Sequence, residues 1–373
     1  MWTLARKILM HDRIKFAVAA AGVSVSVWLV LVQVGLYLGF MQNASTLIDH
    51  SNAELWVTGE GNENFDFAAP IDDKQTYRVA QTDGVARAER MILAFGQFKL
   101  ESGGNQGVEV VGLERGATML SPWNVVDGDD RRIADATSIV IDRSEFPKLG
   151  VGGVGERREI TGARAKVVAL TDGIRSFTTS PFVFTNLDSA RAYTRLGPEQ
   201  LTYVLVRSEP GADIGALKAR IDAIPGVDAY TKDEFSERTR SYWSSRTGVG
   251  TGFFMTAVMG VLVGLVVVGQ ILYNGTLEHL KEYGTLKAMG ASSASIVKTI
   301  LYQALLSAII GYGIGSALAA LSRQGMRAAN LNLVLSGELL VGTAVLTAVM
   351  CSLAATLSIL KVLRLDPASV FKG

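Results

Sequence analysis

Few side chains in this sequence of 373 residues stand in a pattern that performs chemistry. The three histidines, His11, His50 and His279, are far apart, and none belongs to an H-E-x-x-H or similar metal-binding pattern. Residues 127–130 begin like a calcium loop, but Arg131 takes the position of the third ligand, so we interpret them as a polar turn. The sequence therefore predicts neither a zinc nor a calcium site.

The glycine-rich segments do not predict a nucleotide site either. The run 150–155 satisfies G-x-G-x-x-G, but residues 156–160 look like a strand where a dinucleotide fingerprint needs a helix, so we expect a glycine turn. A phosphate-binding loop is missing because the sequence contains no Gly-Lys pair, and no G-x-S-x-G elbow occurs. Cys351 lies in an apolar stretch and reads as a small buried side chain. We expect a chain that is not an enzyme and has no cofactor of its own.

The segment 277–291 is the part of the chain best suited to hold a partner. Leu277, Leu280, Gly284 and Ala288 recur at helical spacing and form one small or apolar face. Such a helix either lies on the inner surface of a membrane or inserts into the groove of a cytoplasmic protein, and periodicity alone leaves both open. The predicted docking residues are Leu280, Lys281, Glu282, Tyr283, Gly284, Leu286, Lys287, Ala288, Met289 and Gly290.

Four long stretches without a charged residue must position this segment. Each is longer than the roughly 20 residues that a helix needs to cross about 30 Å of hydrocarbon. The first is too long for the apolar core of a signal peptide, which favours an uncleaved anchor. We predict transmembrane helices at 16–41, 247–277, 299–322 and 339–360.

Glycines recur four residues apart in these spans, a pattern that lets helix backbones approach closely. Whether the contacts lie within one chain or between two stays open. No Asp, Glu, Lys, Arg or His lies inside a span, which argues against an ion-coupled carrier. The glycines predicted to pack helices are Gly248, Gly252, Gly260, Gly264, Gly311 and Gly315.

Lysine and arginine residues near the spans predict the orientation. The N-terminal segment 1–15, the loop 278–298 and the tail 361–373 together carry ten, whereas the loop 323–338 carries two. Because short cytoplasmic loops are enriched in these residues, we expect both termini and the 278–298 loop in the cytoplasm. The N-terminal segment is predicted to be amphipathic, and 323–338 to be a short outer loop.

The insert 42–246 differs in composition from the rest of the chain, because it holds 54 of the 71 charged residues. It alternates helical runs, clearest at 214–224, with strand-like runs, and we expect an extracytoplasmic α+β domain. Residues 232–246 look like a helical stalk with Tyr242 and Trp243 at the level of the lipid headgroups. The strand-like runs are 54–58, 92–100, 108–112, 138–141, 165–170, 182–185 and 203–206.

The order of these parts resembles the FtsX-like and MacB-type (type VII) ABC transporter permeases, which have one span, a large outer domain and three further spans. Residues 281–291, K-E-Y-G-T-L-K-A-M-G-A, are similar to the family's R-E-I-G-x-L-[KR]-A-x-G-A segment, and 364–372 look like its R-x-x-P-x-x-x-[LF]-[RK] ending. Residues 149–170 resemble a strand pair of its outer domain more loosely. Residues 52–57 and 121–123 suggest the DevC-like subgroup.

The resemblance implies a permease subunit that works as a homodimer with two separate ATP-binding subunits, which bind the ATP and Mg. In such permeases the segment matched by 282–290 is a coupling helix seated on the ATPase, and its movement is transmitted mechanically to the outer domain. A membrane fusion protein is a further possible partner of that domain. The function implied is export of an unknown substrate.

Two other functions stay open. A chain of the same architecture can act without transport, as a signalling subunit that switches a cell-wall hydrolase or a sensor. A membrane receptor with a ligand-binding outer domain and no ATPase is the second alternative. The net charge of +1 offers no general attraction for nucleic acid, so the expected surroundings are lipid and protein.

Overall fold

The computed structural model describes residues 13–363 apart from 179, 290, 329 and 330, so the predicted amphipathic N-terminus and the ending 364–372 lie outside the described residues. The chain divides into two compact units. A helical unit comprises Met1–Gly39 and Val249–Gly373, and an α/β unit comprises Phe40–Gly248.

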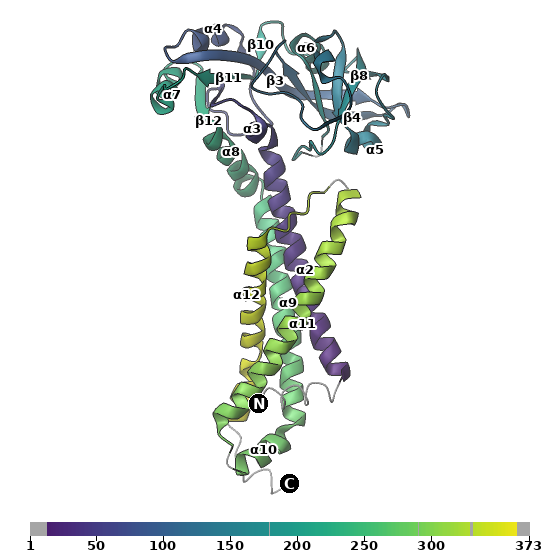
Figure 1. Cartoon of the computed structure of the whole chain (residues 1–373), viewed down its shortest axis with the longest axis vertical. Helices are drawn as coiled ribbons and strands as arrows, with labels where there is room; N and C mark the ends of the chain where they lie inside the picture. The colour runs from purple at the N-terminus through teal and green to yellow at the C-terminus, as the bar shows by residue number, and fades with distance from the viewer. Residues whose placement is uncertain (1–12, 179, 290, 329–330, 364–373) are drawn as a thin grey trace. The chain divides into compact units, whose positions relative to one another are not determined.

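Four helical segments of the described chain are long and apolar enough to cross a membrane, which confirms the predicted fold class. They run alongside one another in Figure 1, and the short helix α10 (Leu280–Ala288) joins the second to the third. The third begins six residues earlier than predicted, at Ser293. The segments are α2 (Arg13–Ala44), α9 (Val249–Glu278), α11 (Ser293–Ala328), and α12 (Gly337–Ala354) with α13 (Thr356–Leu363).

Glycines bring α2 into close contact with α9 and α11. A methyl group on Gly311 would lie 2.4 Å from Val23 Cβ, and one on Gly315 would lie 2.6 Å from the carbonyl oxygen of Ser24. The Ser26 hydroxyl donates to the carbonyl of Gly260 at 2.7 Å. Such distances leave no room for any side chain, so these glycines set how closely the helices approach.

Gly248 makes no packing contact with described residues of its own chain, because it lies before α9 with φ +74 and a methyl group there would meet nothing within 4 Å. Gly252 lies inside α9, but a methyl group there would meet nothing within 4 Å. Gly264 does lie in a helix contact, where a methyl group would lie 2.6 Å from the Ser26 hydroxyl and 2.8 Å from the Met350 sulfur.

The α/β unit is built on one ten-stranded sheet in the order β12-β1-β11-β3-β4-β9-β6-β8-β5, with β7 beside β3 and β8. All seven predicted strands are present. Pairs β4–β9 and β6–β8 are parallel, and the other neighbours are antiparallel. The strands of this sheet are β1 (Leu55–Gly59), β3 (Val85–Lys99), β4 (Asn105–Leu113), β5 (Val125–Gly128), β6 (Ser138–Asp142), β7 (Arg157–Ile160), β8 (Ala163–Thr171), β9 (Phe182–Asn186), β11 (Tyr203–Ser208) and β12 (Val227–Thr231). A two-stranded sheet adds β2 (Ile71–Asp72) and β10 (Gln200–Leu201).

Helices cover both faces of the large sheet, which is why β1, β6 and β9 are buried at every position. On one face, α4 (Lys74–Ala80), α6 (Leu187–Thr194) and α7 (Ile214–Asp222) contribute to a core of aliphatic side chains. On the other, α3 (Thr46–His50) and α8 (Lys232–Ser241) enclose an aromatic core. There Trp56, Phe65, Tyr203 and Phe235 have ring centroids 5.5–6.3 Å apart. The short elements η1 (Asp130–Ala134), η2 (Arg143–Glu145) and α5 (Phe146–Leu149) link the strands.

Two local predictions have different outcomes. Residues 150–155 form the expected turn, with positive φ at Gly150 and Gly155, and lead into β7. The polar turn expected at 127–130 is wrong in part, because 125–128 form the edge strand β5. Gly128 is needed there, since its φ is +81 and a methyl group would lie 2.2 Å from the carbonyl oxygen of Val168.

Candidate partner-docking site

The helix α10 has one face packed against its own unit and one face free. Tyr283 and Gly284 are buried, and the Tyr283 hydroxyl lies beside Gln303 of α11. Burial raises the pKa of Tyr283 to about 12, so its hydroxyl keeps its proton at neutral pH. Leu280 and Leu286 are half-buried against the same core. These buried residues hold α10 on the helical unit, so they are not available for contact with a partner.

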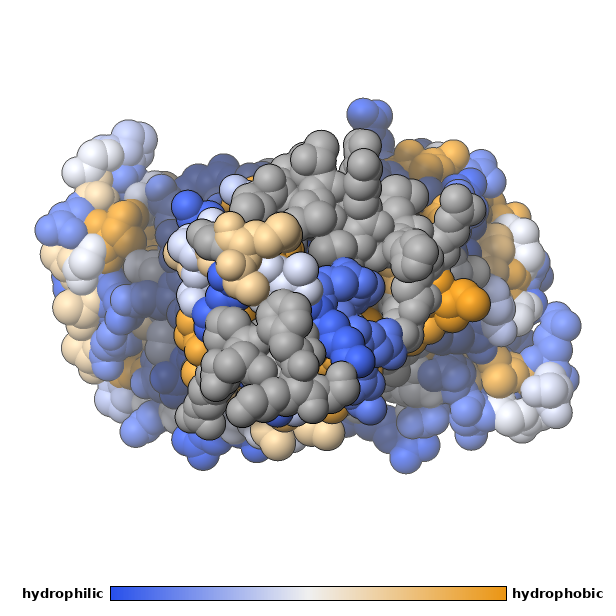
Figure 2. Space-filling model, turned by 90° about the horizontal axis from the view of Figure 1, so that it is seen from below, coloured by the Kyte–Doolittle hydropathy of each residue, from blue (hydrophilic) through white to orange (hydrophobic). Residues whose placement is uncertain are grey.

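The exposed face of α10 combines charge with apolar surface. Met289 is 72% exposed, and a carboxylate oxygen of Glu282 lies 3.0 Å from His279 Nδ1. Figure 2 shows hydrophilic surface directly beside hydrophobic surface in the view from below. The exposed residues of the predicted set are Lys281, Glu282, Ala288 and Met289; Lys287 is half-buried and Gly290 lies outside the described residues.

The apolar face expected from periodicity is therefore only partly correct. Leu277 belongs to α9 and is 38% exposed, and Ala288 is exposed as well. His279 separates α9 from α10, but backbone hydrogen bonds from His279 to Gly275 and from Tyr283 to His279 continue the helical pattern across it. Tyr283, counted with the docking residues, becomes an anchor of the bundle.

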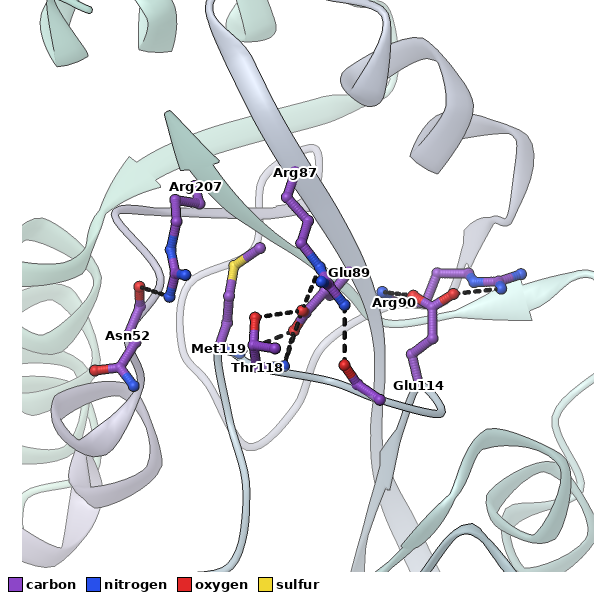
Figure 3. A network of polar contacts seen from close by, with 9 residues as sticks. Asn52, Arg87, Glu89, Arg90, Glu114, Thr118, Met119 and Arg207 are labelled. Atoms are coloured by element: carbon purple, nitrogen blue, oxygen red, sulfur yellow. Dashed lines mark hydrogen bonds and ion pairs between the residues drawn. The ribbon is translucent and has the colours of Figure 1, made fainter. Parts of the chain in front are cut away.

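In the α/β unit, a buried carboxylate holds the loop that follows β4 (Figure 3). Glu89 of β3 is 1% exposed and accepts hydrogen bonds from the backbone N–H groups of Thr118 and Met119 and from the Thr118 hydroxyl. Arg87 Nε lies 2.7 Å from the same carboxylate. Both oxygens of the buried Glu89 carboxylate therefore have hydrogen-bond donors.

The same loop is tied to the segment that follows α3. The backbone N–H of Asn52 donates to the Met119 carbonyl at 2.6 Å, and the Asn52 carbonyl accepts from Arg207. Arg90 adds a second ion pair, with Glu114 at 2.6 Å. A displacement of residues 51–54 would thus pull directly on the loop 114–119.

A second buried acidic cluster lies on the aromatic side of the sheet. Asp66 and Glu109 are 4% and 1% exposed, and neither forms an ion pair with a described basic side chain. Burial raises the pKa of Asp66 to about 7, against the opposing hydrogen bond from Trp243. Burial, and then the nearby charge of Asp66, raise the pKa of Glu109 to about 8.

Glu109 and Asp66 connect two segments that are far apart in the sequence. The hydroxyls of Ser176 and Thr178 donate to Glu109 Oε1, while Glu109 Oε2 has no hydrogen-bond partner among the described residues. Trp243 Nε1 donates to Asp66 at 2.8 Å, and its ring lies 4.2 Å from that of Phe177. The predicted stalk is α8 followed by a π-helical turn at Tyr242–Arg246, and Trp243 packs inside the α/β unit.

Comparisons with known proteins fit this division of the chain. The family model of the MacB-like periplasmic core domain matches residues 16–224, more than half of the chain, and that of the FtsX-like permease C-terminal matches residues 254–367. The chain belongs to the MacB-type, FtsX-like ABC transporter permeases. It is thus a multi-pass membrane protein of a permease family.

Two relatives of this permease come from strains of Mycobacterium tuberculosis, and both are named uncharacterized ABC transporter permeases. Each is 23% identical over 293 residues, which cover 78% of this chain and 76% of the relative. The extracellular domain of the noncanonic ABC-type transporter YknZ from Gram-positive bacteria has a TM-score of 0.37 at 12% identity, over 48% of this chain and 99% of that domain. The periplasmic region of MacB from Actinobacillus actinomycetemcomitans has a TM-score of 0.36 at 9% identity, over 51% and 94%.

Sequence reasoning missed the acidic cluster of this permease. A signal was present, because Glu109 interrupts the apolar run 108–113 and Asp66 stands between Phe65 and Phe67. A carboxylate at an otherwise apolar strand position marks either an ion pair or a displaced pKa. The pairing with Trp243, which is 177 residues further along, leaves no such signal.

Proposed function

We propose that this permease couples ATP hydrolysis by a separate ATP-binding subunit to movement of the α/β unit, and thereby exports a substrate. The observation that carries the proposal is the exposed face of α10. Tyr283 and Gly284 are buried within the helical unit. Lys281, Glu282 and Met289 are exposed. A mixed face of charge and a flexible apolar side chain suits a protein groove better than lipid alone.

The remaining parts of the proposal concern surroundings and partners. The chain has no phosphate-binding loop, so the ATP and Mg belong to the partner subunit. The excess of Lys and Arg supports a location of α10 and both termini in the cytoplasm, with the α/β unit on the outer side. The membrane proposed, from the family, is a bacterial inner membrane. The active unit is a homodimer, and a membrane fusion protein is a candidate partner of the α/β unit.

Coupling requires that the two states of the ATPase contact α10 differently, because a ligand shifts an equilibrium only through its differential affinity. Movement of α10 then reaches α11 through the buried core that Tyr283 shares with Ile300 and Ala304. The chain continues from α2 through α3 to Asn52, whose backbone holds the loop 114–119.

The docking proposal is tested with substitutions confined to the exposed face. In Lys281→Glu and Met289→Asp, we expect the amount of co-purified ATP-binding subunit to fall at least tenfold, because interface residues of this kind contribute about 1–2 kcal/mol each. Stimulation of ATP hydrolysis by the permease should fall in parallel. Leu286 and Gly284 are unsuitable positions, since they pack against the helical unit.

The matched control is Lys74→Glu, which makes the same charge change at an exposed side chain of the α/β unit. It should leave both readouts at the wild-type level. Full recovery of the ATP-binding subunit with Lys281→Glu and Met289→Asp would refute docking through α10.

A further inference from the structure

A groove of about 770 Å³ in the α/β unit is lined mainly by basic side chains. It lies along the β7–β8 hairpin and the end of β3, and none of its residues belongs to α10 or to the acidic cluster around Glu109. Its volume is that of a typical small-molecule site. The charged residues that line it are Lys99, Arg157, Arg158, Arg164 and Lys166, with Glu101 and Glu159.

Both acidic side chains of the groove are already engaged. Glu159 lies 3.4 Å from Lys99, and Glu101 lies 3.0 Å from Arg158. The other three basic side chains, Arg157, Arg164 and Lys166, form no ion pair among the described residues. Counted over the lining residues, the groove carries an excess of three positive charges. Glu156, which does not line it, adds a second carboxylate beside Arg158 at 2.5 Å.

The strand register brings these basic side chains close together, which destabilises the sheet when no anion is bound. Arg157 and Lys166 are direct partners across the antiparallel pair β7–β8, so they project from the same face. Like charges in this arrangement destabilise a sheet. Arg164 stands two residues before Lys166 on that face, opposite Glu159, whose carboxylate is engaged with Lys99. An anion in the groove would replace this repulsion by attraction.

We propose that this groove binds a soluble ligand that carries two or more phosphate groups. Arginine presents a planar fork of donors that matches phosphate oxygens, and lysine adds a point charge. Side chains on directly paired and diagonal strand positions lie about 5–8 Å apart, a spacing that one or two linked phosphates can bridge. Thr137, at the edge of the groove, has φ +61, an uncommon backbone conformation for a β-branched residue.

Calorimetric titration of the full chain in a non-ionic detergent with tripolyphosphate tests the proposal. We expect saturable binding that weakens as salt is added, because exposed charges are screened. Arg157→Gln and Lys166→Gln should each weaken it at least tenfold. Glu159→Gln should tighten it, an effect that a damaged fold cannot produce.

The matched control is Arg115→Gln, since Arg115 is exposed and lies beyond the opposite end of the β3–β4 ladder. Its affinity for tripolyphosphate should equal that of the wild type. Absence of binding to the wild-type chain, or an equal loss in Arg115→Gln, would overturn the site. Citrate binding as tightly as tripolyphosphate would overturn the assignment to phosphate.

Discussion

Replacing Glu109 by glutamine should flatten the pH dependence of the free energy of unfolding of the α/β unit. The folded-state pKa of Glu109 is about 8, whereas its ordinary value is 4.5. A group whose pKa is raised on folding stabilises the folded state fully below the ordinary value and loses this contribution as pH rises through the folded value. The stabilisation should therefore decline between about pH 4.5 and about pH 8.

The magnitude follows from linkage. Within this window the folded chain keeps a proton that the unfolded chain has released, so each pH unit costs about 1.4 kcal/mol per fully titrating group. Asp66, with a pKa raised to about 7, acts in the same direction, and the two groups share part of the effect. A glutamine side chain resembles the protonated acid and cannot ionise. The variant should therefore gain about 1 kcal/mol on the wild type for each unit from about pH 5 to about pH 7.

Denaturant unfolding of the full chain in a non-ionic detergent, followed by tryptophan fluorescence, measures this difference. Trp56, Trp123 and Trp243 report on the α/β unit, and the other tryptophans of the chain can be replaced by phenylalanine in all samples. Glu237→Gln, at an exposed position of α8, is the matched control and should follow the wild type. Parallel pH profiles for the wild type and Glu109→Gln would refute the assignment of a raised pKa.

Two further substitutions test the packing that positions the site. Gly315→Ala should lower the melting temperature of the purified chain, because its methyl group meets the Ser24 carbonyl at 2.6 Å and overpacking of this kind costs about 1–3 kcal/mol; Gly313→Ala, in the same helix but with nothing within 4 Å, should not. Glu89→Ala should destabilise the α/β unit by about 2–4 kcal/mol and speed hydrogen exchange at residues 114–119, because it leaves the N–H groups of Thr118 and Met119 unpaired. Wild-type exchange of this loop in Glu89→Ala would contradict the holding role of Glu89, and Glu237→Ala serves as its control.

Much of the fold could be predicted from the sequence, because it depends on the distribution of charged and apolar residues along the chain. Stretches without charge predicted the four membrane helices, and short apolar runs predicted seven strands that are all present. The strands that were missed, β2, β5, β10 and β12, are short or lie at the edge of a sheet. Edge strands bury one side only or very little, so their sequences carry weak apolar patterns; β5 is exposed at every position.

Periodicity and resemblance to a family motif predicted the docking segment. They did not predict which of its residues are buried and which are exposed. Leu277, at the end of α9, is 38% exposed, whereas Tyr283 is buried against the helical core. Which face of a helix is buried depends on the helices packed beside it, and periodicity alone does not record them. Lys281, Glu282 and Met289 emerge as the exposed residues only once the helix is seated on α11.

The sequence by itself determined which segments are apolar enough for a membrane and that the large insert is a charged domain of mixed helix and strand. These properties depend on the composition of neighbouring residues. Only the tertiary structure decided that Asp66 lies with Trp243, that Glu109 is buried beside them, and that Arg157 faces Lys166 across a ladder. The displaced pKa values and the excess charge of the groove depend on burial and on distances between residues far apart in the chain, which no local pattern records.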